Sequence, residues 1–338
     1  EKHHCTFCGL NGLGMGFRSK SPERIRSELS ELASRHRITF FEATDNILDM
    51  RHVQSLLGAI AESREDYRFF YEIKANLTQP QIRALHRGGV RWVQPGIESL
   101  NTHVLTLMHK GATMLQNVRL LKWCRYYNIR VSWNLIWGFP GETEDDYTAE
   151  LDVLHSLTHL EPAHACTRIW LERFSPYFTD RHTYPLHTLH AEASYHHAYP
   201  ITNLNHDKIA YFFDYQMDNT LPDSAHTNTQ TFITNWQTRY HSNHRETLTY
   251  RRTSDSILID DTRHNTPTGT TEYHGPLARA YEYCTDTMRT PTQIATHLNH
   301  TVTPDEIRQA FTHPCQHRFM LTENDRYLAL ALPTNPNW

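Results

Sequence analysis

Two cysteines near the start of the chain have the spacing of metal-binding thiolates. Cys5 and Cys8 stand three residues apart, with the aromatic Phe7 directly before the second cysteine. Soft thiolate ligands suit iron–sulfur clusters and zinc, and a pair on a tight loop can reach one metal centre. The pattern favours the last two ligands of an iron–sulfur cluster loop, which needs a third cysteine upstream.

Zinc is the alternative metal for this pair. A zinc site needs a second Cys or His pair at similar separation. His3 and His4 could supply it, but histidine is abundant in this chain, with 25 residues, so their adjacency is weak evidence. We expect ordinary, unreactive thiols at the remaining cysteines, which lie alone in apolar or helical surroundings. These are Cys124, Cys166, Cys284 and Cys315.

Composition and charge argue against several classes of protein. The chain has 338 residues, 38% of them hydrophobic, which suits one large α/β domain and a smaller one. The formal net charge of −4 gives no basic field for nucleic acid. We expect no membrane span and no signal peptide, because no run of about 20 apolar residues occurs. Six irregularly spaced cysteines make no disulfide framework, so we expect a reducing, cytoplasmic location.

Short apolar runs alternate with amphipathic stretches after the cysteine loop. Ser21 is a helix N-cap, and Pro22 stands at the first position of a helix that runs to about Arg35. Strands alternating with helices of this length predict βαβ units and a parallel sheet. The predicted strands are Ile38 to Phe41, Phe69 to Ile73, Trp92 to Gln94, Val131 to Ile136 and Thr167 to Leu171. The predicted helices are near Met50 to Glu62, Gln79 to Arg87, Met114 to Tyr127 and Glu144 to Leu157.

Polar residues recur at the strand ends, where parallel sheets bind ligands. Gly96 would let a ligand approach the backbone, and Glu98 can accept hydrogen bonds. One acidic residue at a strand end is more often a helix cap or a solvated loop residue. Recurrence along four consecutive strands favours a site instead. The segments are Glu42 to Asn46, Glu72 to Asn76, Gln94 to Ser99 and the polar strand around Asn134.

The predicted fold class is α/β: a partial (β/α)6 TIM-type barrel with its first strand missing, plus a C-terminal α+β winged-helix-like module. A ligand loop at the carboxyl edge of a barrel follows a strand. Five strands are predicted after the cysteine loop and none before it. The missing strand and the missing third cysteine share one explanation, so we expect a fragment truncated inside the cluster loop.

Five segments match a known family in order and spacing: Cys5 to Cys8, Asp45 to Leu48, Gly96 to Ser99, Met108 to Gly111 and Gly138 to Glu142. They resemble the radical SAM superfamily and, more narrowly, its cobalamin-dependent-type enzymes. The surrounding sequence is similar to radical SAM maturation proteins of ribosomally made, modified peptides (RiPPs), at residues 1–12 and 173–178. The resemblance covers about residues 1–180.

This resemblance implies a [4Fe–4S] cluster held by three cysteines. One iron would stay open to bind the amino and carboxylate groups of S-adenosylmethionine. Cys5 and Cys8 match the second and third cluster ligands. Phe7 matches an aromatic position that lies against the adenine.

The resemblance also implies cofactor-binding residues at the strand ends. Glu98 resembles a carboxylate that contacts the ribose or the methionine part. Lys110 matches a basic position that pairs with the methionine carboxylate or with Glu98. Asp45 and Asn134 complete the expected cofactor-binding set.

The implied function is a radical SAM enzyme that modifies a RiPP precursor peptide, with cobalamin-dependent C-methylation as one reaction. Reductive cleavage of S-adenosylmethionine would give a 5′-deoxyadenosyl radical, or a methyl group would pass through cobalamin bound by the parent protein. Expected partners are the precursor peptide and an electron donor such as flavodoxin or ferredoxin, with no nucleic acid and no membrane. Because the first cluster cysteine is absent, we expect the chain as given to be inactive. The alternative is a catalytically silent barrel that binds a peptide or partner.

The second half predicts two further units after the 1–180 core. Residues 181–245 are expected to form a helical cap or linker, with helical patterns over 207–220 and 230–243. Residues 246–338 read as strands, three helices and a closing hairpin, the winged-helix-like module. Its third helix carries Asp305 and Glu306 against Arg308, which is unlike a DNA-recognition helix. Strand addition by a leader peptide along the hairpin edge is the expected role.

Overall fold

A parallel sheet forms the centre of the N-terminal half. The structure is a computed structural model that describes residues 4–10, 14, 16–63, 65–243, 245–263 and 269–336. Four strands pair in the order β1-β2-β3-β4, and β5 pairs with β6, all in parallel. The strands are β1 (Phe40–Glu42), β2 (Arg68–Ile73), β3 (Val90–Pro95), β4 (Arg130–Val131), β5 (Asn134–Trp137) and β6 (Ala165–Arg168).

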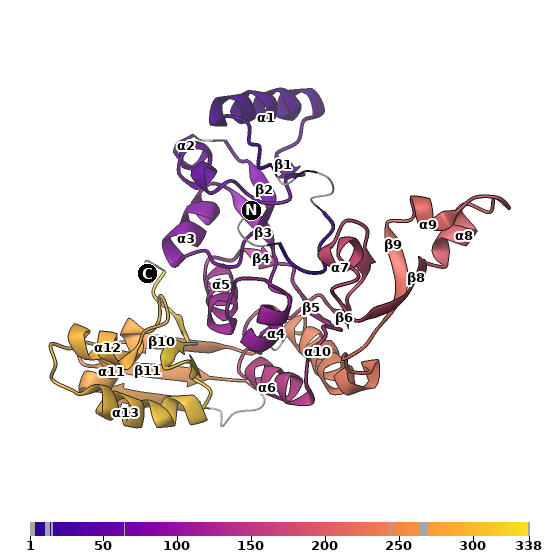
Figure 1. Ribbon diagram of the computed structural model, residues 1–338. Helices are drawn as coiled ribbons and strands as arrows, with labels where there is room; N and C mark the ends of the chain where they lie inside the picture. Colours follow the sequence, from indigo (N-terminus) through magenta and orange to yellow (C-terminus); the bar gives the residue numbers. More distant parts are fainter. Residues whose placement is uncertain are drawn as a thin grey trace.

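The two groups of parallel strands join into one partial barrel. The Ser132 amide donates to the Val93 carbonyl at 2.9 Å, and the Ile136 amide donates to the Glu98 carbonyl at 3.0 Å. An isolated parallel bridge joins Glu98 to Leu135. The predicted α/β barrel is therefore confirmed, with its strands side by side and helices around them (Figure 1).

Two predicted strands are each split in the structure. The predicted strand 131–136 breaks at Ser132 and Trp133, because the chain changes partner there from β3 to β6. The indole N–H of Trp133 donates to the Glu161 carbonyl at 3.0 Å at this break. The predicted strand 167–171 becomes β6 and the separate β7 (Leu171–Glu172). Trp170, between them, is 68% exposed, so the chain leaves the barrel at this residue.

Helices cover the sheet and begin where their caps predict. The Ser21 hydroxyl accepts the Arg24 amide at 3.2 Å, which confirms the predicted start of the first helix. Thr78, Thr113 and Thr143 form capping boxes at later helices. The predicted helix 50–62 is a 3₁₀ turn followed by a short helix. The helices are α1 (Pro22–His36), η1 (Met50–Val53), α2 (Leu56–Glu62), α3 (Gln79–Arg87), α4 (Thr102–Leu107), α5 (Met114–Tyr126) and α6 (Glu144–His155).

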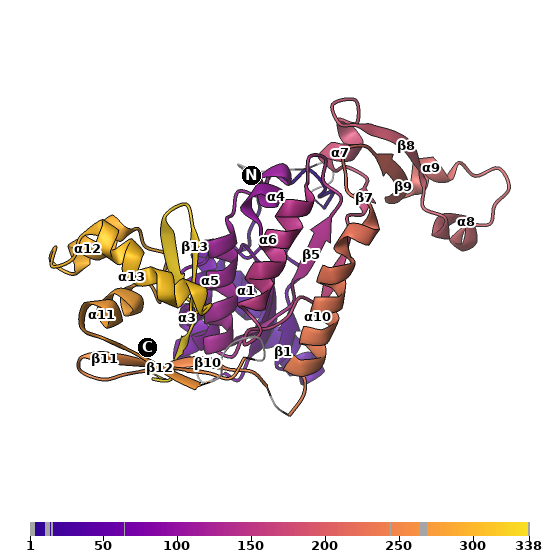
Figure 2. The same ribbon diagram turned by 90° about the horizontal axis from the view of Figure 1, so that it is seen from below.

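Residues 171–240 form an arm and a long helix rather than a purely helical cap. Figures 1 and 2 show β8 and β9 with two short helices projecting away from the barrel. The predicted helix 207–220 is wrong: after one helical turn the chain is strand β9, in which Phe213 and Met217 are buried while Asp214 and Gln216 are exposed. The elements are α7 (Pro176–Thr179), β8 (Leu186–Ala191), α8 (Ser194–Ala198), α9 (His206–Ile209), β9 (Phe212–Met217), η2 (Asp223–His226) and α10 (Thr227–Tyr240).

Helix α10 confirms the second predicted helix of this region and packs on the barrel. Trp236 is fully buried, and its indole N–H donates to the Thr158 carbonyl at 3.0 Å. Its ring lies edge-on to Trp133, with 6.3 Å between ring centroids. The aromatic side chains of this helix therefore serve packing.

The C-terminal module has the predicted three helices and hairpin. Its sheet order is β12-β11-β10-β15, and β13 pairs antiparallel with β14. Arg289 and Tyr327 exchange two backbone hydrogen bonds of 2.9 and 3.0 Å, so the outer edge of β14 is engaged there. The elements are β10 (Leu248–Arg252), β11 (Ser256–Asp261), β12 (Gly269–His274), α11 (Gly275–Tyr283), α12 (Pro291–His297), α13 (Pro304–Gln316), β13 (Met320–Glu323), β14 (Arg326–Ala329) and β15 (Leu332–Pro333).

Barrel and module share one hydrophobic core. Buried side chains of α5, such as Trp123 and Cys124, belong to the same cluster as Tyr281 of α11 and Leu328 of β14. No helix in the described residues has the length and apolar character that crossing a membrane requires. The core positions the carboxyl ends of β2 and β3 beside the cysteine loop.

Candidate active site

A cavity of about 360 Å³ lies between the cysteine loop and the ends of the parallel strands. Glu72 of β2 and Gln94 of β3 line one side, and Cys5 and Cys8 line another. Strand ends place polar side chains here because parallel strands all point their carboxyl ends to one edge. The cavity therefore lies where the sequence predicts a ligand site.

One hydrogen bond within the cysteine loop and two from neighbouring helices hold the loop. The Cys8 amide donates to the Cys5 carbonyl at 3.2 Å and closes a tight turn. The Thr6 amide donates to the Met108 carbonyl, and the Thr6 carbonyl accepts the Tyr177 amide, both at 3.0 Å. The loop is therefore fixed by the end of α4 and the start of α7.

Glu172 anchors the other end of this loop. Its carboxylate accepts the Gly9 amide at 2.7 Å. A Cβ atom at Gly9 would stand 2.1 Å from the Arg173 carbonyl oxygen, so only glycine allows this close packing. Burial raises the pKa of Glu172, although the hydrogen bond from Gly9 opposes this. Sequence reasoning missed Glu172, yet it directly follows the predicted strand 167–171, so the strand-end rule could have identified it.

Cys5 and Cys8 present two half-buried thiols to the cavity. Burial raises the pKa of the Cys8 thiol, and the nearby Glu172 carboxylate and Cys5 raise it further. Within the described ranges, no group of three His, Cys, Asp or Glu side chains is arranged to hold a metal ion. The assignment of Cys5 and Cys8 as two ligands of a cluster stays a prediction. His3 lies outside the described residues, and the His4 ring contacts the Cys8 carbonyl at 2.9 Å.

Glu98 and Lys110 form an ion pair on the cavity wall. The Lys110 Nζ lies 3.3 Å from Glu98 Oε1, and the two side chains are 16% and 18% exposed. Burial by itself would lower the pKa of Lys110, but Glu98 and Cys5 outweigh it and raise the pKa. Glu98 has a φ of 61°, a left-handed conformation that is uncommon for glutamate. The ammonium also lies 5.5 Å from the centroid of the Phe7 ring.

Gly96 makes room for this pair. A Cβ at Gly96 would stand 2.7 Å from the Lys110 Nζ. The sequence predicted that Gly96 lets a ligand approach the backbone closely. In the structure the group that approaches Gly96 closely is the Lys110 side chain. Phe7 in turn packs edge-on against Phe139, with 5.8 Å between ring centroids.

Phe139 belongs to a turn that Glu142 locks. The Glu142 carboxylate accepts the Gly138 amide at 2.9 Å, the Phe139 amide at 3.0 Å and the Tyr147 hydroxyl at 2.5 Å. Its other oxygen accepts the Leu221 amide at 3.0 Å. Glu142 therefore stabilises the turn that carries the ring behind Phe7.

The structure brings six of the seven predicted site residues to this cavity: Cys5, Phe7, Cys8, Glu98, Lys110 and Asn134. Asp45 is the exception. It lines an adjoining hollow of about 430 Å³ together with Cys8, and Asn46 lines both spaces. The roles of these residues as cofactor ligands stay predictions.

The charged lining suits a zwitterionic ligand. Glu72, Glu98 and Glu172 face the cavity together with Lys74 and Lys110. Burial raises the pKa of Glu72. Separated carboxylates and ammonium groups can bind the amino and carboxylate ends of one amino-acid-like molecule.

Comparison with known proteins finds a family that the N-terminal part resembles. Residues 2–154 match the family model described as the Radical SAM superfamily. An uncharacterized methyltransferase of Pyrococcus horikoshii is 25% identical over 177 residues, which cover 49% of this chain and 39% of that protein. The bacteriochlorophyllide d C-12(1)-methyltransferase of Chlorobaculum tepidum is 27% identical over 158 residues, covering 44% of this chain and 34% of that protein.

Two solved structures also resemble this chain. The radical S-adenosylmethionine methyltransferase TsrM from Kitasatospora setae has a TM-score of 0.45 at 21% identity, covering 53% of this chain and 36% of TsrM. The cobalamin-dependent S-adenosylmethionine radical enzyme OxsB has a TM-score of 0.49 at 12% identity, covering 93% of this chain and 44% of OxsB. The chain therefore spans less than half the length of each of these four proteins.

The family match and the cavity agree in position. The matched residues contain the cysteine loop, Glu98, Lys110 and Asn134. The radical SAM family uses a [4Fe–4S] cluster and S-adenosylmethionine. Residues 2–154 of this chain are therefore similar to the Radical SAM superfamily.

Proposed function

We propose that this chain is part of a radical SAM enzyme that methylates a carbon atom of a ribosomally made precursor peptide, with cobalamin as methyl carrier. The observation that carries the enzyme assignment is the meeting of Cys5, Cys8, Phe7, Glu98 and Lys110 at one cavity. Two curated relatives named as methyltransferases support methylation. The sequence resemblance to RiPP maturation proteins supports the peptide substrate.

When bound, the cluster and S-adenosylmethionine would supply reductive cleavage of the sulfonium, and cobalamin would supply methyl transfer. Cys5 and Cys8 would hold the cluster as two of its thiolate ligands. Glu98 and Lys110 would bind the polar groups of S-adenosylmethionine, because an ion pair on the cavity wall offers both a carboxylate and an ammonium. Phe7 would cover the adenine and exclude water from that side.

The proposed chemistry also needs an electron donor and a reducing environment. An electron donor such as flavodoxin or ferredoxin would supply the electron for cleavage. No disulfide joins the cysteines within the described residues, which supports a reducing, cytoplasmic environment.

Anaerobic cluster reconstitution tests the proposal on the full natural polypeptide that contains this sequence. The reduced protein is examined by electron paramagnetic resonance with and without S-adenosylmethionine. We expect a [4Fe–4S]⁺ signal that shifts when S-adenosylmethionine is added. Cys8→Ser should abolish the signal, whereas Cys124→Ser, at a buried thiol of α5, should preserve it.

Silence of the wild-type protein would refute the enzyme assignment. It would leave the alternative function, a barrel that binds a peptide or partner without catalysis. If the cluster forms, incubation with the precursor peptide, reductant, cobalamin and S-adenosylmethionine as methyl donor should add one methyl group to the peptide, detected by mass spectrometry. A product without that gain would refute methylation and leave the radical SAM assignment intact.

A further inference from the structure

One face of helix α5 carries three side chains that all bind the same turn of the C-terminal module. Arg119, Lys122 and Trp123 lie three and four residues apart, so they share a helix face. Arg119 Nη1 donates to Thr287 Oγ1 at 2.9 Å. Lys122 Nζ donates to the carbonyl of residue 285 at 2.8 Å, and Trp123 Nε1 to that of residue 286 at 3.2 Å. The turn between α11 and α12 is therefore bound to the barrel.

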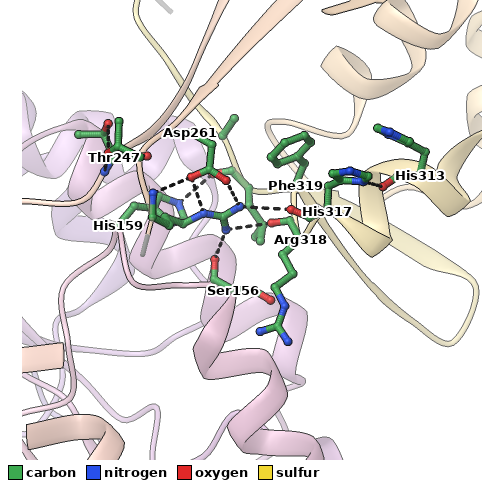
Figure 3. A network of polar contacts seen from close by, with 12 residues as sticks. Ser156, His159, Thr247, Asp261, His313, His317, Arg318 and Phe319 are labelled. Carbon is green, nitrogen blue, oxygen red and sulfur yellow. Dashed lines mark hydrogen bonds and ion pairs between the residues drawn. The ribbon is translucent and has the colours of Figure 1, made fainter. Parts of the chain in front are cut away.

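The barrel holds the module at a second place, the end of α6. Arg263 Nη1 donates to the Ser156 carbonyl at 2.7 Å and to the Arg318 carbonyl at 2.9 Å. Asp261 pairs with Arg263 at 2.8 Å, and both side chains are at most 1% exposed. Figure 3 shows Ser156, Asp261 and Arg318 converging in this network. Two separated clamps fix the orientation of the module against the barrel.

Arg119 also reaches the rim of the candidate active site. Its Nη2 donates to the Asn76 carbonyl at 3.1 Å and to the Leu77 carbonyl at 3.0 Å. These residues belong to the turn after β2, and Lys74 and Asn76 of this turn line the site cavity. One guanidinium group thus joins the C-terminal module to the cavity rim.

We propose that Arg119 is a positioning residue through which the docked C-terminal module holds the turn of residues 74–77 in place at the candidate site. The chemistry favours arginine, because the planar guanidinium presents donors in two directions at once. Arg119 is only 7% exposed, so water does not readily replace these bonds. That the turn of residues 74–77 matters for ligand binding rests on the proposed function. The hydrogen bonds that join the module to this turn through Arg119 do not depend on it.

Three variants of the full natural polypeptide test the proposal by hydrogen exchange. Arg119→Met removes both arms of the link. Thr287→Val removes only the bond to the module. Arg125→Met is the matched control, because Arg125 is on the same helix but its guanidinium lies over the Tyr240 ring, 5.8 Å from the ring centroid.

The expected result is local. Arg119→Met should speed exchange over residues 74–78 by roughly threefold or more, since local opening sets exchange rates. Thr287→Val should show a smaller increase in the same peptides, and Arg125→Met should show none. Unchanged exchange in Arg119→Met, or an equal increase over the whole barrel, would overturn the proposal.

S-adenosylmethionine affinity separates this proposal from the proposed function. In the reconstituted wild type, binding should be measurable, and Arg119→Met should weaken it by about tenfold, because small misplacements of binding groups are costly. If the wild type binds no S-adenosylmethionine, the proposed function fails, while the exchange result still decides the link. If exchange changes without any loss of affinity, Arg119 holds the turn as proposed, and its role in positioning the binding site is refuted.

Discussion

Lys122 is the most informative single perturbation, because it is fully buried and its partners are neutral. Its ammonium donates to the carbonyls of Thr285 at 2.8 Å and Ala329 at 2.6 Å. Burial lowers the pKa of Lys122 from its ordinary 10.5 to about 7. The folded protein therefore binds this proton more weakly than the unfolded chain does.

The sign of the pH effect follows from that difference. Below pH 7 the lysine is charged in both states, and the folded state carries the full cost of burying the charge. Between pH 7 and 10.5 the unfolded chain still binds the proton while the folded protein loses it. The free energy of unfolding should therefore rise with pH across this window, by up to about 1.4 kcal/mol per pH unit for one proton.

Lys122→Met tests this slope. Urea unfolding, followed by circular dichroism, is measured at several pH values between 7.5 and 9.5 for both proteins. Subtracting the variant from the wild type removes the contributions of other titrating groups. We expect the difference to rise by about 2–3 kcal/mol over this range.

The control for this experiment is Lys208→Met, at an exposed lysine of α9. It should leave the pH dependence of the wild type unchanged. If Lys122→Met and the wild type have parallel stability profiles, Lys122 is not titrating in this window, and the burial argument is wrong.

Two further substitutions have expected outcomes. Gly96→Ala would place a Cβ 2.7 Å from the Lys110 Nζ, so the ammonium must shift. The free energy of unfolding measured in urea should change by less than about 1 kcal/mol. S-adenosylmethionine binding to the reconstituted protein should weaken about tenfold. Equal affinity would contradict the ion-pair role. Asp261→Asn leaves the buried Arg263 without its carboxylate and should cost about 3–5 kcal/mol in urea unfolding. The more exposed Asp260→Asn should cost less than about 1 kcal/mol, and equal losses would contradict this reasoning.

The central features of the site could be predicted because they follow local rules. A cysteine spacing indicates shared ligation, and the carboxyl ends of parallel strands meet at one edge. Those two rules placed Cys5, Cys8 and Glu98 at one cavity without knowledge of tertiary contacts. The start of α1 was equally local, since it depends on the neighbouring cap Ser21.

The arm could not be predicted because its strands depend on distant partners. Residues 212–217 read as part of a helical pattern, but pairing with β8 makes them a strand. Asp45 was placed correctly at a strand end, yet it faces a neighbouring hollow, since side-chain direction depends on the packing around it. The docking of the C-terminal module was equally hidden, because its bonds join residues more than 150 positions apart.

Two buried lysines show why residue type alone does not identify a site. Lys110 lies beside a carboxylate and thiols, which raise its pKa and keep it charged at the cavity. Lys122, a few turns along the same segment, has mainly backbone carbonyls as partners, and burial lowers its pKa to about 7. The first can bind an anionic group of a ligand, whereas the second is committed to docking the module. Arg119 lies between these two lysines in the sequence and bonds both the C-terminal module and the turn of residues 74–77. Residues 110–123 therefore contribute to the cavity wall and also attach the module to the barrel.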